Sequence, residues 1–161
     1  MKLFAALILW ITVIGAPDIA SIRKMYPTVG KSEANAKEFT AKLAGIANTD
    51  ETILVAYKAA AILLDSKYEK KLSSKMNRFK EGAKLLESTI TSEPNSIEIR
   101  MIRLSIQENV PGITGYKKNI KEDKAFIIAH INEQNATLKE YIKAFIVQSK
   151  SFSAKEKQSA K

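Results

Sequence analysis

The residues best suited to hold a charged ligand are Arg100, Arg103 and Gln107, which recur at steps of three and four. This spacing places their side chains on one face of a helix expected over Ile97–Asn109. Most other positions of that helix are apolar, so it is expected to be largely buried. Its arginines then either pair with acids inside the fold or line a groove that takes a carboxylate or a phosphate. Three acids are close enough in sequence to be the internal partners: Glu87, Glu93 and Glu98.

A second candidate is the segment 67–84, in which seven basic residues stand against two acids, a net charge of +5. The basic residues are Lys67, Lys70, Lys71, Lys75, Arg78, Lys80 and Lys84. Tyr68, Leu72, Met76 and Phe79 interleave with them at steps of four, four and three, as on one helix face. The pattern is typical of a strip that binds a membrane surface or another anion, and equally of an ordinary helix with its lysines in solvent.

Residues for catalysis or metal binding are scarce in this sequence. There is no cysteine, and the single histidine, His130, stands near the end of an expected helix. No phosphate-binding glycine loop, HExxH, GxSxG or EF-hand pattern occurs. The acid pair Asp65 and Glu69 is surrounded by lysines, as on a solvated helix surface. We therefore expect no catalytic site, no metal site and no cofactor.

The first sixteen residues resemble a secretory signal peptide. Lys2 precedes an apolar run from Leu3 to Ile14, followed by Gly15 and Ala16. The run is shorter than the roughly 20 residues that a spanning helix needs. The sequence predicts cleavage near Ala16 and export to the periplasm or the extracellular space, the alternative being an uncleaved N-terminal anchor.

The remainder predicts an all-α domain over residues 17–150 and a lysine-rich tail over 151–161. Six glycines, four prolines and no alternating strand pattern favour about seven helices stacked as helical hairpins. The expected helices cover 18–26, 32–46, 53–64, 76–90, 97–109, 116–131 and 137–148. The third has eleven apolar residues in twelve, so it belongs at the centre of the core. Two capping boxes are predicted, Thr137 with Glu140 and Ser153 with Glu156.

The segment Phe79–Leu104 resembles the hinge between two tetratricopeptide repeats. The resemblance implies that the small Gly82 packs against the preceding helix, that Leu86 and Ile90 face inward, and that Pro94 ends the helix. It covers about half of one repeat. Arg100, Arg103 and Leu104 stand where that motif has aromatic and small residues.

The whole chain is similar to a group of small, uncharacterised exported helical proteins of Bacteroidota-type bacteria. The similarity is carried by IRKMYP (22–27), AYKAA (56–60), NSIEIRMIRLSIQENVP (95–111) and YIKAFIVQSKSF (141–152). It implies a location in the cell envelope and no particular activity.

Two functional hypotheses follow, both for an exported and non-catalytic protein. In the first, a groove between stacked hairpins binds a protein or peptide, with polar contacts from Arg100, Arg103 and Gln107 and apolar anchors Tyr57 and Tyr116. In the second, the segment 67–84 binds anionic envelope lipid or polysaccharide, in keeping with a net charge of +9. We expect no nucleic-acid partner, because an exported protein meets phosphate chiefly on lipids and polysaccharides.

Overall fold

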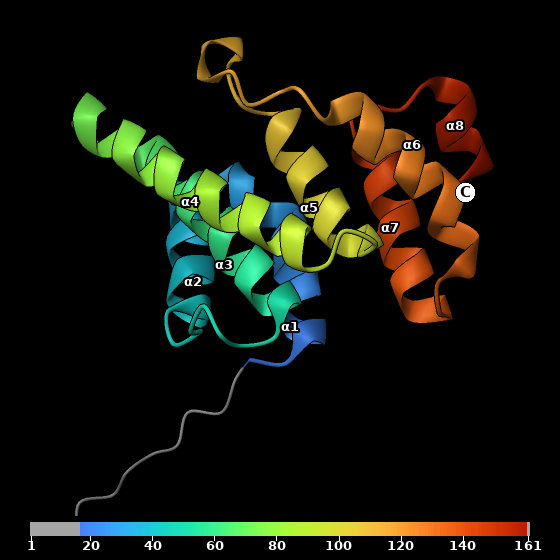
Figure 1. Ribbon diagram of the computed structural model, residues 1–161, viewed down its shortest axis with the longest axis horizontal. Coiled ribbons are helices and arrows are strands. Elements are labelled where there is room, and N and C mark those ends of the chain that lie inside the picture. Colours follow the sequence, from blue (N-terminus) through green and yellow to red (C-terminus); the bar gives the residue numbers. More distant parts are fainter. Residues whose placement is uncertain (1–16, 161) are drawn as a thin grey trace, which may run out of the picture.

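The computed structural model describes residues 17–160 of the 161-residue chain (Figure 1). The signal peptide predicted at 1–16 lies outside the described residues. Within 17–160 the chain is all-α and has no strand, so the predicted fold class is confirmed. The helices are α1 (Ile19–Met25), α2 (Glu33–Leu43), α3 (Thr52–Asp65), α4 (Leu72–Ser92), α5 (Ile97–Gln107), α6 (Ile120–His130), α7 (Ala136–Gln148) and α8 (Ala154–Ser159). Four short 3-10 helices connect them: η1 (Tyr26–Lys31), η2 (Ser66–Tyr68), η3 (Gly112–Thr114) and η4 (Ile131–Glu133).

Side-chain caps fix several helix starts, and one of the two predicted capping boxes is present. Ser153 accepts a hydrogen bond from Glu156 N, and the Glu156 carboxylate accepts one from Ser153 N. The box predicted at Thr137 and Glu140 is wrong. Helix α7 begins one residue earlier, and Asn135 caps it by accepting from Leu138 N at 3.0 Å. Asparagine ranks with serine as an N-cap, which explains the earlier start.

Helix α3 is the centre of the fold, as its composition predicts. It contacts α2, α4 and α5, and Figure 1 shows it between α2 and α4. Ala56, Ala59 and Ala60 are fully buried, and their small side chains let the neighbouring backbones approach closely. The Tyr57 ring packs edge-on against Tyr26, with ring centroids 5.1 Å apart.

Helices α3 and α4 form the closest hairpin, and Gly82 is its point of nearest approach. A Cβ atom at Gly82 would lie 2.8 Å from Leu63 Cγ and 3.0 Å from the Ala59 carbonyl oxygen. Leu86, one turn further along α4, is fully buried. The packing of Gly82 against the preceding helix is therefore as predicted.

We expect Gly82→Val to destabilise the protein by about 2 kcal/mol or more, because the branched side chain would push α3 and α4 apart. Thermal or urea unfolding followed by circular dichroism measures the loss. Gly45→Ala is the matched control, because nothing lies within 4 Å of a Cβ there. Equal stability of the two variants would contradict the close approach of α3 and α4.

The C-terminal helices form a second group beside the first (Figure 1). Helix α5 contacts α3 and α4 on one side and α6 and α7 on the other, and it thereby joins the two groups. Among residues 17–160, no helix is long and apolar enough to cross a bilayer.

The tail is ordered as α8 and is tied to α6 by charge. The ammonium of Lys124 lies 2.8 Å from the Glu156 carboxylate, and Phe152 packs into the core. The hydrogen bond from Lys124, followed by those from Ser153, lowers the pKa of Glu156 to about 2.

We expect acid to release α8. A carboxylate whose pKa is lower in the folded protein stabilises that form only while it is ionised. The stabilisation is complete above pH about 4.5, the ordinary pKa, and is lost as the pH falls towards about 2. Amide exchange of residues 154–159 measures the release. Relative to the intrinsic rate at each pH, these amides should be weakly protected in Glu156→Gln at every pH. Protection in the unmodified chain that does not fall as the pH falls towards about 2 would contradict the expected release.

Candidate functional site

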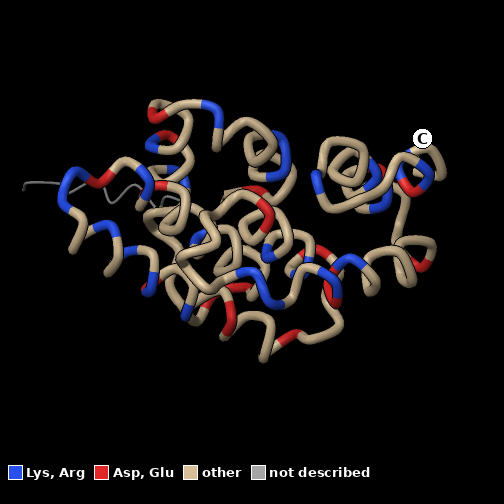
Figure 2. Tube along the Cα trace, turned by 90° about the horizontal axis from the view of Figure 1, so that it is seen from above, with Lys and Arg blue, Asp and Glu red and all other residues tan. Residues whose placement is uncertain are grey.

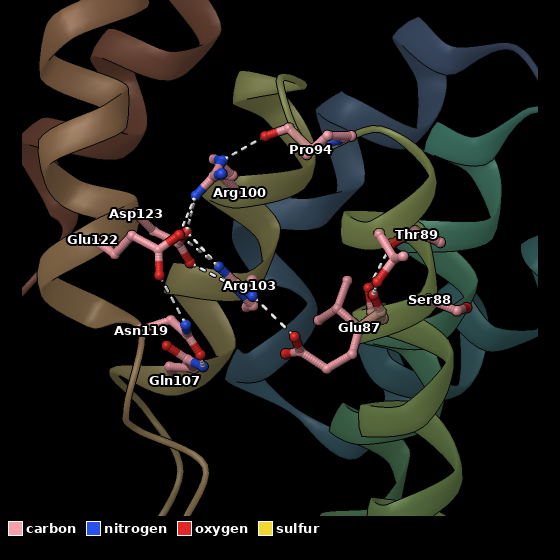
Figure 3. Close-up of polar contacts among 12 residues, drawn as sticks. Glu87, Ser88, Thr89, Pro94, Arg100, Arg103, Gln107, Asn119, Glu122 and Asp123 are labelled. Atoms are coloured by element: carbon pink, nitrogen blue, oxygen red, sulfur yellow. Dashed lines mark hydrogen bonds and ion pairs between the residues drawn. The ribbon is translucent and has the colours of Figure 1, made fainter.

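The polar face of α5 meets α4 and α6 in a buried ion-pair network (Figure 3). Arg103 forks onto Asp123: its Nε donates to Oδ2 and its Nη2 to Oδ1, both at 2.7 Å. The Arg103 Nη1 donates to Glu87 Oε2 at 2.9 Å. The side chains of Arg103 and Asp123 are 4% and 0% exposed. This network therefore fastens three helices together at one point.

Arg100 completes the network from the previous turn of α5. Its Nη1 donates to Glu122 Oε1 at 2.9 Å and to Asp123 Oδ1 at 3.1 Å. Its Nε donates to the Pro94 carbonyl oxygen at 2.8 Å. The guanidinium carbon stands 4.2 Å from the centroid of the Phe126 ring, a cation–π contact. Arg100 is therefore held at Nε and Nη1, and over its guanidinium plane, by groups of its own chain.

The electrostatics of the network favour the charged form of the arginine. Burial alone would lower the pKa of Arg103, but the hydrogen bonds and charge of Asp123, followed by those of Glu87, raise it above its ordinary value. Tyr116 donates its hydroxyl proton to Glu87 Oε1 at 2.7 Å. Burial, then this hydrogen bond, raises the pKa of Tyr116. Both groups thus keep their protons at neutral pH and serve as donors.

Gln107 lies at the deep end of this face and is fully buried. Its Nε2 is 3.5 Å from Asn119 Oδ1, the limit of a hydrogen bond. Its Oε1 has no hydrogen-bond partner within residues 17–160. Gln107 therefore packs as part of the core, where no partner molecule reaches it.

Tyr57 belongs to a separate polar cluster around Glu98. The Tyr57 hydroxyl donates to Glu98 Oε1 at 2.7 Å. The hydroxyl oxygens of Tyr57 and Tyr141 are 3.1 Å apart. Arg23 of α1 donates to both oxygens of the same carboxylate, at 2.7 and 2.6 Å. Tyr57 is fully buried. This cluster fastens α1, α3, α5 and α7 together.

The structure thus brings together four of the five predicted contact residues: Arg100, Arg103, Gln107 and Tyr116. Tyr57 lies in the other cluster. Of the three acids proposed as partners, Glu87 pairs with Arg103, whereas Glu98 pairs with α1. Within the described chain, no basic group lies within 4.0 Å of Glu93. The principal partner of the arginines is Asp123 of α6, which the sequence did not single out for them.

The segment 67–84, called the basic strip below, comprises η2 and the first half of α4. Arg78 pairs with Asp65 at 2.7 Å, at the last residue of α3. Residues 72–77 of α4 therefore lie beyond the end of α3, and Figure 1 shows these turns projecting from the body. Leu72 is 74% exposed and Met76 is 44% exposed. The strip thus carries two uncovered apolar side chains on a projecting helix end.

The lysines of the basic strip form no ion pair within the described chain, and the Lys67 ammonium lies 5.4 Å from the centroid of the Tyr68 ring. Within the described residues, no carboxylate oxygen lies within 4.0 Å of any of its six ammonium groups. Five of the six side chains are exposed: Lys67, Lys70, Lys71, Lys80 and Lys84. Blue segments recur along this end of the molecule in Figure 2. Leu72, Met76, Lys80 and Lys84 follow one another at steps of four, so two apolar and two basic side chains share one ridge.

An open hollow of about 410 Å³ adjoins the strip, between the start of α2 and the start of α4. Its lining mixes both signs of charge: Glu33, Lys37, Asp65, Tyr68, Glu69, Lys70, Lys71 and Ser74. Glu33 and Lys37 already pair with each other at 2.7 Å, and Arg78 holds Asp65 and Glu69. The charges left over in the hollow are those of Lys70 and Lys71.

His130 ends α6, and within the described residues its side chain makes no hydrogen bond to Arg100, Arg103 or their carboxylate partners. Its Nδ1 lies 2.9 Å from Glu133 Oε2, and its ring lies against Phe126 with centroids 4.2 Å apart. These contacts are those of a half-exposed residue at a helix end, the placement that the sequence predicts.

No known family model, curated protein or solved structure matches the chain. The tetratricopeptide-like segment keeps the local packing that its resemblance implies, at Gly82 and Leu86, and α4 ends at Ser92 before Pro94. A repeat family is not identified for it. Inference about function therefore rests on the residues themselves.

Proposed function

We propose that this protein binds a membrane surface rich in anionic lipid through the basic strip. The observation that carries the proposal is the exposure of Leu72 and Met76 on a projecting helix end, within a segment whose six lysines form no ion pair among the described residues. Each lysine near an anionic surface contributes about 1 kcal/mol to binding. Apolar side chains set among lysines are typical of helices that lie in a lipid headgroup layer.

The geometry supports this function better than binding of a peptide by the arginines. The guanidiniums of Arg100 and Arg103 already donate to carboxylates of their own chain, so a peptide carboxylate would have to displace Asp123 or Glu122. Neither the hollow beside the basic strip nor the smaller one near Met25 is lined by these arginines. Binding of a protein or peptide in a groove stays a prediction.

The proposal assigns the protein to the cell envelope and assigns it no catalytic role. It is supported there by the resemblance of residues 1–16 to a secretory signal peptide.

Salt dependence tests this function. Residues 17–161 are sedimented with equimolar phosphatidylglycerol–phosphatidylcholine vesicles from about 0.1 M to about 1 M salt, over which the Debye length falls from about 10 to about 3 Å. We expect strong binding at low salt and little at high salt. Binding to soluble lipopolysaccharide carbohydrate but not to these vesicles would identify polysaccharide as the ligand and overturn the proposal.

A further inference from the structure

The loop that joins α5 to α6 presents an isolated apolar side chain to solvent. Ile113, in η3, is 97% exposed, more than any other large hydrophobic residue of the described chain. Figure 1 shows this loop projecting at the top of the body and the first turns of α4 projecting at its upper left. The described chain thus has exposed apolar side chains on two separate projecting segments: Ile113 on the loop, and Leu72 and Met76 on α4.

The exposure of Ile113 is built into an ordered turn. The Thr114 hydroxyl donates to the Pro111 carbonyl oxygen at 2.8 Å, and Gly115 N donates to Gly112 O at 3.0 Å. Gly115 has a φ of 66°, a conformation that glycine adopts without strain. Tyr116 then anchors the end of the turn through Glu87. The loop is therefore held in a shape that points its apolar residue outward.

Charge around the loop matches the charge of the basic strip. Lys117, Lys118 and Lys121 follow the turn and are exposed. The two acids that flank the loop are engaged elsewhere: Glu108 accepts from the hydroxyl of Ser149 at 2.6 Å, and Glu122 pairs with Arg100. The surface around Ile113 is therefore net positive, as it is around Leu72.

We propose that Ile113 enters the lipid layer as a second contact point, so that the protein docks on an anionic bilayer by the loop and the basic strip together. This inference rests on the proposed function and makes it specific to lipid. Lysines attract any polyanion, but an exposed isoleucine gains only from an apolar environment, which a bilayer offers and a hydrated polysaccharide does not.

Tryptophan fluorescence tests the proposal. The single tryptophan of the chain is Trp10, so residues 17–161 contain none. Residues 17–160 form the buried core that the structure describes, so 17–161 is the segment to use. Three variants each carry one reporter: Ile113→Trp in the loop, Leu72→Trp in the strip, and Ile128→Trp as the control. Ile128 is 43% exposed on the last turn of α6, which leads away from the loop.

With equimolar phosphatidylglycerol–phosphatidylcholine vesicles, we expect a blue shift for the reporters at 72 and 113 and none at 128. Vesicle binding with a shift at 72 but not at 113 would overturn the second contact and leave the proposed function standing. A blue shift at all three positions would also overturn the second contact, because the membrane would then touch the control position 128 as well as the loop and the strip. Absence of binding in all three would overturn both proposals.

Affinity gives an independent reading that needs no reporter. Ile113→Asn should weaken vesicle binding roughly 10-fold or more, since it removes the transfer of one large aliphatic side chain into lipid. Its circular dichroism should be unchanged because the side chain packs against nothing. Ile128→Asn, the matched control, should bind like the unmodified chain. Equal binding by Ile113→Asn and the unmodified chain would overturn the proposal.

Discussion

Arg103→Met is expected to destabilise the protein by about 3–5 kcal/mol, a large share of the roughly 5–15 kcal/mol that holds a domain together. The substitution keeps the aliphatic stem but leaves Asp123, fully buried, with a single remaining contact to Arg100. An uncompensated buried carboxylate is costly because the interior cannot solvate it. Urea unfolding followed by circular dichroism gives the difference in free energy.

The double variant Arg103→Met with Asp123→Leu separates the cost of the unpaired charge from that of lost packing. Removing both charges should recover more than about 2 kcal/mol, because a buried pair replaced by apolar groups is often neutral. Lys143→Met is the surface control. It breaks a pair whose acid, Glu140, is 71% exposed, and should change stability by less than about 0.5 kcal/mol. A loss below about 1 kcal/mol in Arg103→Met would show that the arginine is not structural and would revive the groove hypothesis.

Removing four lysines of the basic strip is expected to weaken binding to anionic vesicles roughly 1,000-fold. At about 1 kcal/mol per lysine, the four together account for about 4 kcal/mol. The substitutions are Lys70→Gln, Lys71→Gln, Lys80→Gln and Lys84→Gln, all at exposed positions. Glutamine keeps a good helix propensity, so α4 should remain folded. Co-sedimentation with vesicles measures the affinity.

The matched control removes four exposed lysines outside the strip: Lys24, Lys31, Lys42 and Lys155. Both variants lose the same net charge, so only the position of the charge differs. We expect the control to bind far more tightly than the strip variant. If the two weaken equally, the overall charge of the protein attracts the membrane and the strip has no special role.

The arginine network shows what spacing predicts and what it does not. Steps of three and four placed Arg100 and Arg103 on one face of α5, and its apolar remainder predicted that the helix is largely buried, with the arginines either paired inside or lining a groove. Asp123 was not identifiable as their partner because it lies 20 residues from Arg103, beyond the long connection between α5 and α6. Glu98 is nearer in sequence and its carboxylate could also pair with an arginine, but it faces α1 and pairs with Arg23. Only the packing of the helices decides between such acids.

The basic strip shows the same division between pattern and packing. A helix was predicted over 76–90, but α4 begins four residues earlier, at Leu72, and Tyr68 lies before it in η2. Tyr68 and Phe79 are half-buried against the core. Leu72 and Met76 share that periodicity but are exposed, because α4 has 21 residues and α3 has 14. Helix α4 extends beyond the end of α3, so α3 does not cover the first turns of α4. Periodicity identifies the apolar face of a helix, but it does not predict which other element, if any, packs against that face.

The measurement that tests the central claim most directly is the fraction of residues 17–161 that sediments with phosphatidylglycerol–phosphatidylcholine vesicles, compared with phosphatidylcholine alone, at low salt. We expect substantial binding to the anionic vesicles and little to the zwitterionic ones, since the lysines of the basic strip provide most of the attraction. Equal binding to both kinds of vesicle, or binding to neither, would contradict the claim.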